Sequence, residues 1–158
     1  MGTSVDIIVQ TSINASSQTS FAYIVPIDLS HIFRRFLLIP GVTRTDESQQ
    51  WVTPGLSRTV YFDDGSTARE ELLTIVPSES FSYKISGFTG INRLLVKHIM
   101  GEWQFTGSNS GTDIVWTYSL YPRNIITRAI VNVCVAPMLR IFLQRALDML
   151  KRDLEKEK

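Results

Sequence analysis

Residues 131–144, VNVCVAPMLRIFLQ, are almost entirely apolar and carry a proline, Pro137, near their middle. The stretch belongs to a longer segment that begins after Asn124, a good helix-capping residue, and runs to about residue 156. A helix of this length spans about 48 Å at 1.5 Å per residue. Because a proline inside a helix bends it, the segment predicts one long, curved C-terminal helix that needs a broad apolar partner.

The same segment is long enough to cross a bilayer, so a transmembrane helix is the alternative. Residues 125–143 contain Arg128, Asn132 and Arg140. Each arginine at the centre of a bilayer would cost about 2.5–3.5 kcal/mol. We therefore predict a soluble helix with a wide buried face and no stable membrane insertion. No secretory signal opens the chain, which favours a cytoplasmic location.

The rest of the chain predicts the partner of this helix. Residues 5–13 are rich in β-branched side chains, which is typical of a strand. Short helices are expected at 18–25 and 28–38, followed by an irregular stretch at 39–55. Beyond it the pattern predicts an antiparallel meander of six strands, in which the clearest segments with a period of two are 56–62, 67–76, 80–86, 94–106 and 112–121.

The turn Asp63-Asp64-Gly65 sets the pairing of the first two clear strands of the meander. A type I turn with Gly65 in the left-handed conformation places Arg58 opposite Glu70, whereas a two-residue loop places Arg58 opposite Glu71. We prefer the first register because it produces an apolar face with one charge pair. Besides that pair, the face then carries Leu56, Val60, Phe62, Ala68, Leu72 and Val76.

Together these elements predict an α+β fold in which a seven-stranded antiparallel sheet faces one long helix. Seven strands are about 30 Å wide at ~4.8 Å per strand. One helix cannot fill the concave side of so wide a sheet, so a cavity is expected between them. The apolar stretch 131–144 would then be a lid over that cavity, with Pro137 setting its curve.

The ordered set of segments resembles the SRPBCC superfamily, also called START-like or helix-grip proteins, and within it the polyketide cyclase/dehydrase-like branch. It is carried by the segments NASSQTSFAYIVPI, LIPGV, DGSTAREEL, SFSYKI and GEWQFTGSNSGTDIVWTYSLYP, followed by the C-terminal helix. The resemblance covers nearly the whole chain, taken as one domain, 1–158. It implies a helix-grip fold with a curved seven-stranded sheet, two short helices and a long C-terminal helix around a cavity. It also implies a lipid-like, polyketide-like or aromatic ligand.

Two opposed charges on the apolar face, Arg58 and Glu70, are the first candidates for a functional site. Buried charges have to be paired, and two interpretations stay open: a structural ion pair, or a ligand anchor with acid–base chemistry. The resembling family tends to carry an Arg and a Glu at these positions. Tyr83 or Tyr118 could supply a proton or hold an enolate. The catalytic candidates are thus Arg58, Glu70 and Tyr83.

Aromatic side chains on the inner strands are candidates to stack against an apolar ligand, with filling of the core as the alternative. Trp51 precedes the hairpin and is a candidate for the cavity entrance. Cys134 lies between two valines, which favours an inert core thiol. The expected ligand-binding residues are Trp51, Arg58, Val60, Glu70, Leu72, Tyr83, Trp103, Phe105, Trp116, Tyr118, Cys134 and Met138.

Composition excludes several other functions. The net charge is +1, from 16 Lys and Arg against 15 Asp and Glu, which argues against a nucleic-acid partner. Two separate histidines and one cysteine make no metal site, and no cofactor motif is present. Three hypotheses stay open: a monomeric or homodimeric carrier of a hydrophobic ligand, a polyketide cyclase/dehydratase-type enzyme, and a lipid-transfer protein with an apolar or basic rim.

Overall fold

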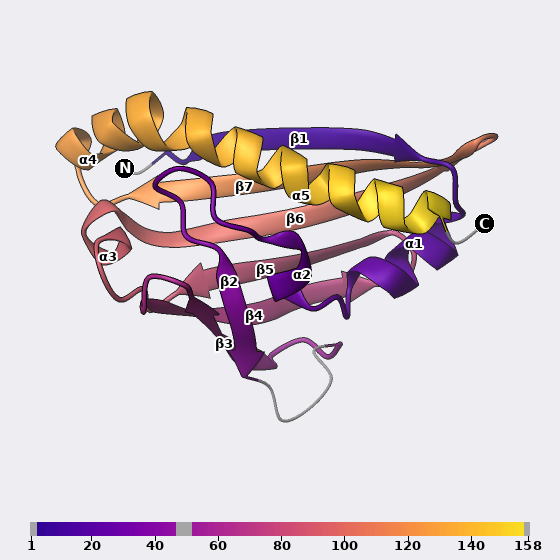
Figure 1. Cartoon of the computed structure of the whole chain (residues 1–158), viewed down its shortest axis with the longest axis horizontal. Coiled ribbons are helices and arrows are strands. Elements are labelled where there is room, and N and C mark those ends of the chain that lie inside the picture. The colour runs from indigo at the N-terminus through magenta and orange to yellow at the C-terminus, as the bar shows by residue number, and fades with distance from the viewer. Residues whose placement is uncertain (1–2, 47–51, 157–158) are drawn as a thin grey trace.

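The computed structural model describes residues 3–46 and 52–156. Its centre is a seven-stranded antiparallel sheet. The strands are β1 (Val5–Ile13), β2 (Val42–Asp46), β3 (Ser57–Phe62), β4 (Thr67–Val76), β5 (Ser80–Ser86), β6 (Val96–Ser108) and β7 (Gly111–Pro122). They lie in the order β1-β7-β6-β5-β4-β3-β2, so consecutive strands from β2 to β7 are neighbours and β1 closes the far edge (Figure 1).

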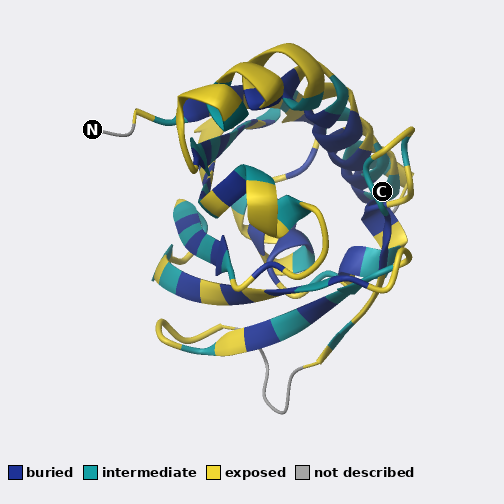
Figure 2. Cartoon of the chain, turned by 90° about the vertical axis from the view of Figure 1, so that its left-hand side faces the viewer, coloured by how far each residue is buried: buried dark blue, intermediate teal, exposed yellow. Residues whose placement is uncertain are grey.

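Helices cover the concave side of this sheet. They are α1 (Ser17–Ile24), α2 (Leu29–Ile32), α3 (Asn92–Leu95), α4 (Ile125–Ile130), a π-helical turn η1 (Val131–Val135) and α5 (Ala136–Lys156). The long helix packs mainly on β1, and Figure 2 shows the sheet curling beneath it. In Figure 1, α1 lies at the right-hand end of the molecule, whereas α3 and α4 lie at the left-hand end.

The β3–β4 hairpin has the predicted register. Arg58 pairs with Glu70 across the two strands. At the turn, Phe62 N–H donates to Ser66 O at 2.9 Å, and Gly65 has a φ of +87°, which favours glycine. Local turn chemistry therefore determined this pairing, as expected.

One part of the predicted inner face is wrong. Between Leu72 and Thr74 the pairing of β4 with β5 shifts by one residue, which is a β-bulge. Beyond the bulge the side chains exchange faces, because successive side chains on a strand alternate. Val76, expected inside, is therefore exposed, and Ile75 packs against the core instead.

The stretch between α2 and β3 also differs from the prediction. The helix expected over 28–38 ends at Ile32, and the supposed irregular stretch contains β2. Between them, residues 33–42 fold back as a compact loop, which we call the flap. A hydrogen bond joins its two ends, since Val42 N–H donates to Phe33 O at 2.9 Å. Leu37, at the tip of the flap, has a φ of +54°. A Cβ at Gly41 would lie 2.7 Å from Arg35 N, so this return of the chain requires glycine.

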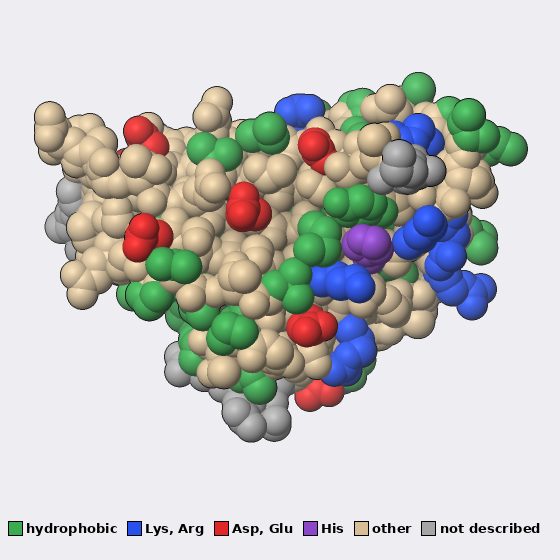
Figure 3. Space-filling view, turned by 180° about the vertical axis from the view of Figure 1, so that it is seen from behind, with side chains coloured by type: hydrophobic (Ala, Val, Ile, Leu, Met, Phe, Trp, Pro, Cys, Tyr) green, Lys and Arg blue, Asp and Glu red, His purple; other side chains and the backbone are tan. Residues whose placement is uncertain are grey.

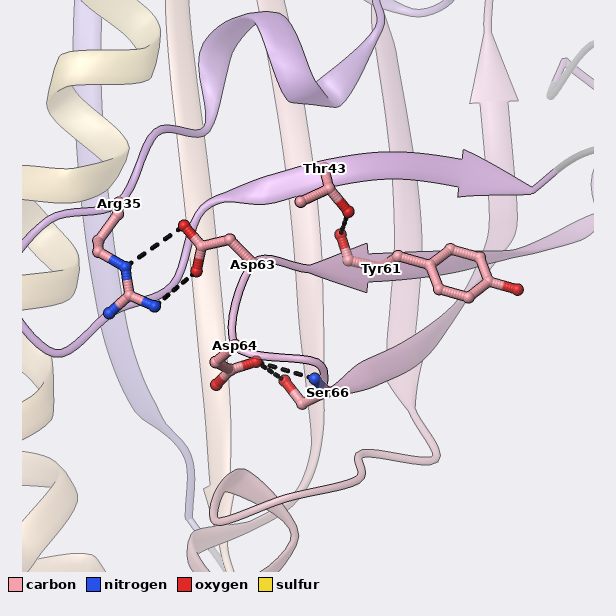
Figure 4. A network of polar contacts seen from close by, with 6 residues as sticks. All are labelled: Arg35, Thr43, Tyr61, Asp63, Asp64 and Ser66. Atoms are coloured by element: carbon pink, nitrogen blue, oxygen red, sulfur yellow. Dashed lines mark hydrogen bonds and ion pairs between the residues drawn. The ribbon is translucent and has the colours of Figure 1, made fainter.

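A charge pair ties the flap to the β3–β4 turn. Arg35 Nη2 lies 2.7 Å from Asp63 Oδ1, and Asp63 N–H donates to Gly41 O at 2.9 Å. In the same turn Asp64 accepts from Ser66 N–H, which helps to hold the turn (Figure 4). The hydrogen bond from Ser66 holds the pKa of Asp64 below its usual value. The flap is thus held in place by the hairpin that carries Arg58 and Glu70.

The C-terminal helix begins where the sequence predicted. The Asn124 side chain accepts from Thr127 N–H at 2.9 Å, and Asn124 N–H donates to the Thr127 hydroxyl, which makes a capping box. Ahead of Pro137, Ala136 N–H donates to Val131 O, one residue further back than in an α-helix. This wider turn accommodates a proline ring that would collide with a carbonyl in a regular helix.

The wide buried face predicted for this helix exists only in its second half. In α5 the inner side is fully covered, with Leu143, Ala146, Leu147 and Leu150 at 0% exposure. In α4 no residue is buried, and in η1 only Val131 is. Cys134, expected in the core, is exposed on this uncovered half.

Candidate functional site

The concave face of the sheet has a filled end and a hollow end. At the filled end, Trp103 stacks on Trp116 with ring centroids 4.2 Å apart, and Phe81 stacks on Trp103 at 5.7 Å. α1 covers this cluster with Phe21, whose ring lies 5.3 Å from that of Phe105. These aromatic side chains therefore pack against each other and form the core.

At the hollow end a cavity of about 450 Å³ lies between the sheet, the flap and the C-terminal helix. Its floor comes from β5, β6 and β7, and its roof from α4, η1 and the start of α5. The residues that line it are Leu38, Ile39, Pro40, Phe62, Ile85, Phe88, Ile91, Asn92, Leu95, Val96, Ile99, Tyr118, Leu120, Ile130, Val131, Cys134, Val135, Met138, Leu139 and Phe142.

The chemistry of this lining is almost wholly apolar. Among the described residues, no charged side chain contributes to it, and the polar side chains are those of Asn92, Tyr118 and Cys134. Asn92 lies on α3 and Cys134 on η1, both toward the exposed end, whereas Tyr118 is 8% exposed on β7. Such a cavity suits a mostly apolar molecule with few polar groups.

Arg58 and Glu70 do not line this cavity. They lie beside a separate space of about 30 Å³, large enough for about one water, with Tyr83, Trp103 and Trp116. Arg58 Nε donates to Glu70 Oε1 at 2.8 Å and Arg58 Nη2 lies 2.6 Å from the same oxygen. The pair is nearly inaccessible, with 3% and 7% of the two side chains exposed.

A row of residues across the sheet connects this ion pair to the large cavity. Tyr83 pairs with Gly101, and Gly101 pairs with Tyr118 on the next strand. The Tyr83 hydroxyl accepts from Trp116 Nε1 at 3.0 Å, and the rings of Tyr83 and Tyr118 meet edge to face with centroids 6.4 Å apart. Burial is the main cause that raises the pKa of both tyrosines, and the nearby Glu70 carboxylate raises it further. Both hydroxyls therefore stay protonated at neutral pH.

Two phenylalanines separate the two spaces. Phe33, at the base of the flap, lines the small space, and Phe142 on α5 lines the large cavity. Their rings stack with centroids 5.2 Å apart, and Phe33 also lies 5.8 Å from Trp116. The ion pair is thus shut off from the cavity by side-chain packing.

The predicted site residues fall into four groups. Tyr118, Cys134 and Met138 line the large cavity. A second group surrounds the small space: Arg58, Glu70, Tyr83, Trp103 and Trp116. Val60, Leu72 and Phe105 are buried but line neither space, and Trp51 lies outside the described residues.

Sequence reasoning missed most of the cavity wall. On the inner strands, aromatic residues were preferred as ligand contacts. The wall instead uses aliphatic side chains such as Ile99 on β6 and Leu139 on α5. Within residues 3–46 and 52–156, no group of three or more His, Cys, Asp or Glu side chains is arranged to hold a metal ion.

Three solved structures show the likeness of the fold. Protein MLL2253 from Mesorhizobium loti has a TM-score of 0.71 at 12% identity, over 98% of this chain and 99% of its own. The di-domain ARO/CYC StfQ from the steffimycin biosynthetic pathway has a TM-score of 0.70 at 16% identity, over 98% of this chain and 52% of StfQ. Ara h 8.0201 has a TM-score of 0.60 at 13% identity, over 92% of this chain and 99% of its own. Likeness at these identities shows the fold alone, and it is the predicted helix-grip fold.

The sequence itself identifies the family. No curated protein matches the chain. The model of one family, described as polyketide cyclase / dehydrase and lipid transport, matches residues 5–155. The chain therefore belongs to this family, within the SRPBCC superfamily that its sequence predicted.

Proposed function

We propose that the protein binds a small, mainly apolar molecule in the large cavity, as a carrier or sensor. The observation that supports this most is the cavity itself, which measures about 450 Å³ and has no charged side chain among the residues in 3–46 and 52–156 that line it. Ligand-binding pockets are typically 300–1,000 Å³, and apolar burial contributes about 25 cal/mol per Å². A cytoplasmic location and a monomeric or homodimeric state stay predictions.

The lining also restricts the chemistry of the ligand. A charged group placed inside would lose its hydration without gaining a partner. Tyr118 lines the cavity and offers a hydroxyl, which can donate one hydrogen bond to a ligand and accept another. We therefore expect an uncharged ligand, lipid-like, polyketide-like or aromatic, with at most a few hydroxyl or carbonyl groups.

Native mass spectrometry of the purified protein, followed by denaturing extraction, tests this proposal. A matched pair of variants sharpens it. Ile99→Phe adds a ring to the cavity wall, whereas Ile8→Phe makes the same change on an outward side chain of β1 that is 51% exposed. We expect a bound apolar compound in the wild type and in Ile8→Phe but not in Ile99→Phe. Equal binding by both variants of the extracted compound, or of a neutral apolar dye, would refute the cavity as the site.

An enzyme of the polyketide cyclase/dehydratase type is the second candidate. It is favoured by the row that leads from the ion pair through Tyr83 to Tyr118 at the cavity wall. In this alternative the cavity confines a chain of carbonyl groups, and a tyrosine or Glu70 moves protons during intramolecular condensation. The catalytic candidates stay Arg58, Glu70 and Tyr83. In the row that starts at the ion pair, Tyr118 is the residue that lines the cavity.

One double variant and one single variant distinguish a carrier from an enzyme. Arg58→Met together with Glu70→Leu replaces the ion pair by apolar groups, and Tyr118→Phe removes one hydroxyl. If the protein is a carrier, the extracted ligand should still bind to the double variant. If it is an enzyme, the double variant should lose turnover of a polyketide substrate while still binding it. Full activity of both variants would show that these residues have no catalytic role.

A further inference from the structure

Large apolar side chains lie in water around the mouth of the cavity. We call them the apolar rim: Leu37, Leu38, Ile91, Leu94, Ile125, Ile126, Ile130 and Val133. Both Leu38 and Ile125 are 81% exposed. Single exposed apolar residues are ordinary, but a contiguous group usually marks an interaction surface.

Three separate segments bring the rim together at one end of the molecule. They are the flap (33–42), the segment that contains α3 (87–97) and the segment that contains α4 and η1 (121–135). Leu38, Ile91 and Ile130, one from each segment, all line the cavity as well, so the rim surrounds its opening. α3 also contacts α4 directly.

The start of the C-terminal helix contributes half of the rim residues: Ile125, Ile126, Ile130 and Val133. The helix Ile125–Lys156 is long enough and apolar enough to cross a membrane. Yet only 22% of its most apolar stretch of 18 residues is buried. The core helix of a soluble protein normally buries such a stretch. Here α4 buries none of its residues, and its Ile125 and Ile126 are exposed to solvent.

The same three segments carry only positive charge. No aspartate or glutamate occurs within 33–42, 87–97 or 121–135. The cations in these segments are Arg34, Arg35, Arg93, Lys97, Arg123 and Arg128. Arg35 is paired with Asp63, and Arg123 Nε donates to Arg93 O at 2.5 Å, which joins α3 to the start of α4. Seen from behind, Lys and Arg gather on the right-hand half of Figure 3, next to hydrophobic side chains, at the end where α3 and α4 lie.

We propose that this end of the protein docks on the surface of an anionic lipid membrane. The apolar rim would enter the interfacial layer, the arginines would contact lipid phosphates, and the cavity mouth would open toward the acyl chains. A second copy of the chain fits less well, since a two-fold contact at the rim would place both sets of cations face to face. The protein would bind at the membrane surface without spanning the bilayer, and the rest of the C-terminal helix would stay packed on the sheet.

Co-sedimentation with vesicles tests the proposal. The full chain is mixed with vesicles of phosphatidylcholine alone, or of phosphatidylcholine with about one third phosphatidylglycerol. We expect binding to the anionic vesicles, weakened at high salt because exposed charges are then screened. Arg93→Gln should weaken it about fivefold, as expected for one cation near such a surface. Equal binding to both kinds of vesicle, or to neither, would overturn the proposal.

Matched variants locate the surface. Ile125→Ser with Ile126→Ser should lower the partition coefficient by at least about tenfold, since two exposed isoleucines that would enter the membrane interface are lost. Ile8→Ser, on the outward side of β1, should leave it unchanged. If sedimentation velocity instead shows a dimer that the Ile125/Ile126 variant dissociates, the rim is an interface between copies. The Ile99→Phe variant should dock normally while losing its ligand, so docking and the proposed ligand site can fail separately.

Discussion

At the residue scale, Gly101 decides how the buried tyrosines fit. It lies between Tyr83 and Tyr118 across three strands, and a Cβ placed there would be 2.3 Å from Tyr83 Cζ. Real side chains never approach so closely, so the Tyr83 ring occupies the space that glycine leaves empty. A glycine in the middle of a strand often marks such a close approach.

We predict that Gly101→Ala displaces Tyr83 and breaks its hydrogen bond with Trp116. The overpacked core should lose about 1–3 kcal/mol in free energy of unfolding, measured by urea denaturation. Gly107→Ala on the same strand is the control, because its new Cβ meets only the Ser17 hydroxyl at 3.2 Å. Equal stability of the two variants would contradict this account of Gly101.

The buried ion pair gives a second prediction at this scale. Arg58→Met alone removes the guanidinium that neutralises the buried Glu70 carboxylate and should cost about 3–5 kcal/mol. Adding Glu70→Leu removes that carboxylate too, so the double variant should recover most of the loss. Thermal unfolding of the three proteins measures both steps. A double variant as unstable as the single one would mean that the pair contributes through its packing and not through its charges.

At the element scale, the start of the C-terminal helix depends on its cap. Asn124→Ala removes the capping box and should cost about 0.5–2 kcal/mol. Asn132→Ala is a matched control, since Asn132 is exposed in η1 and caps nothing. Hydrogen exchange should show faster opening of α4 in the first variant only. Equal protection of α4 in both variants would show that tertiary contacts, and not the cap, hold this helix end.

The contact of α1 and α2 with α5 also depends on one carboxylate. Asp153 accepts from the Tyr23 hydroxyl at 3.1 Å and lies 2.7 Å from His31 Nε2. The hydrogen bond with His31 is the main cause that lowers the pKa of Asp153. A lowered pKa means that the stabilisation is present above the ordinary aspartate value, about 3.9, and is lost as the pH falls through the lower folded value.

We therefore predict a pH-dependent effect of Asp153→Asn. The wild type should be slightly more stable than the variant at pH 6, and the difference should disappear near pH 2. The effect is small because the group is near the surface, where ion pairs contribute little. Urea midpoints across this pH range measure it, and a difference that grows toward low pH would contradict the sign.

At the scale of the whole molecule, ligand binding at the hollow end, as proposed, should make the stability of the protein depend on ligand concentration. A ligand at 100 times its dissociation constant adds about 2.7 kcal/mol to the folded state. At that concentration we expect the neutral dye N-phenyl-1-naphthylamine to raise the melting temperature of the wild type by about 5–11 °C, as about 2–4 °C per kcal/mol implies. Ile99→Phe should show no rise, and a rise equal to that of the wild type would place the dye elsewhere.

Several features of this molecule follow from sequence alone because short-range chemistry sets them. The turn Asp63-Asp64-Gly65 determined the Arg58–Glu70 register, and the period of two predicted the strand that the structure has at Ser80–Ser86. Asn124 determined the helix start. Each of these depends on neighbouring residues or on the period of one element, so no knowledge of the rest of the fold was needed.

Only the tertiary structure decided which part of the inner face is hollow. Trp103, Trp116 and Arg58 face inward as predicted, but α1, α2 and the flap pack over that end and fill it. The cavity lies instead over aliphatic residues such as Ile99, and the uncovered half of the C-terminal helix frames its mouth. A pattern of apolar residues determines which side of an element avoids water. The space left between elements, and the apolar surface left uncovered, depend on how all of them pack together.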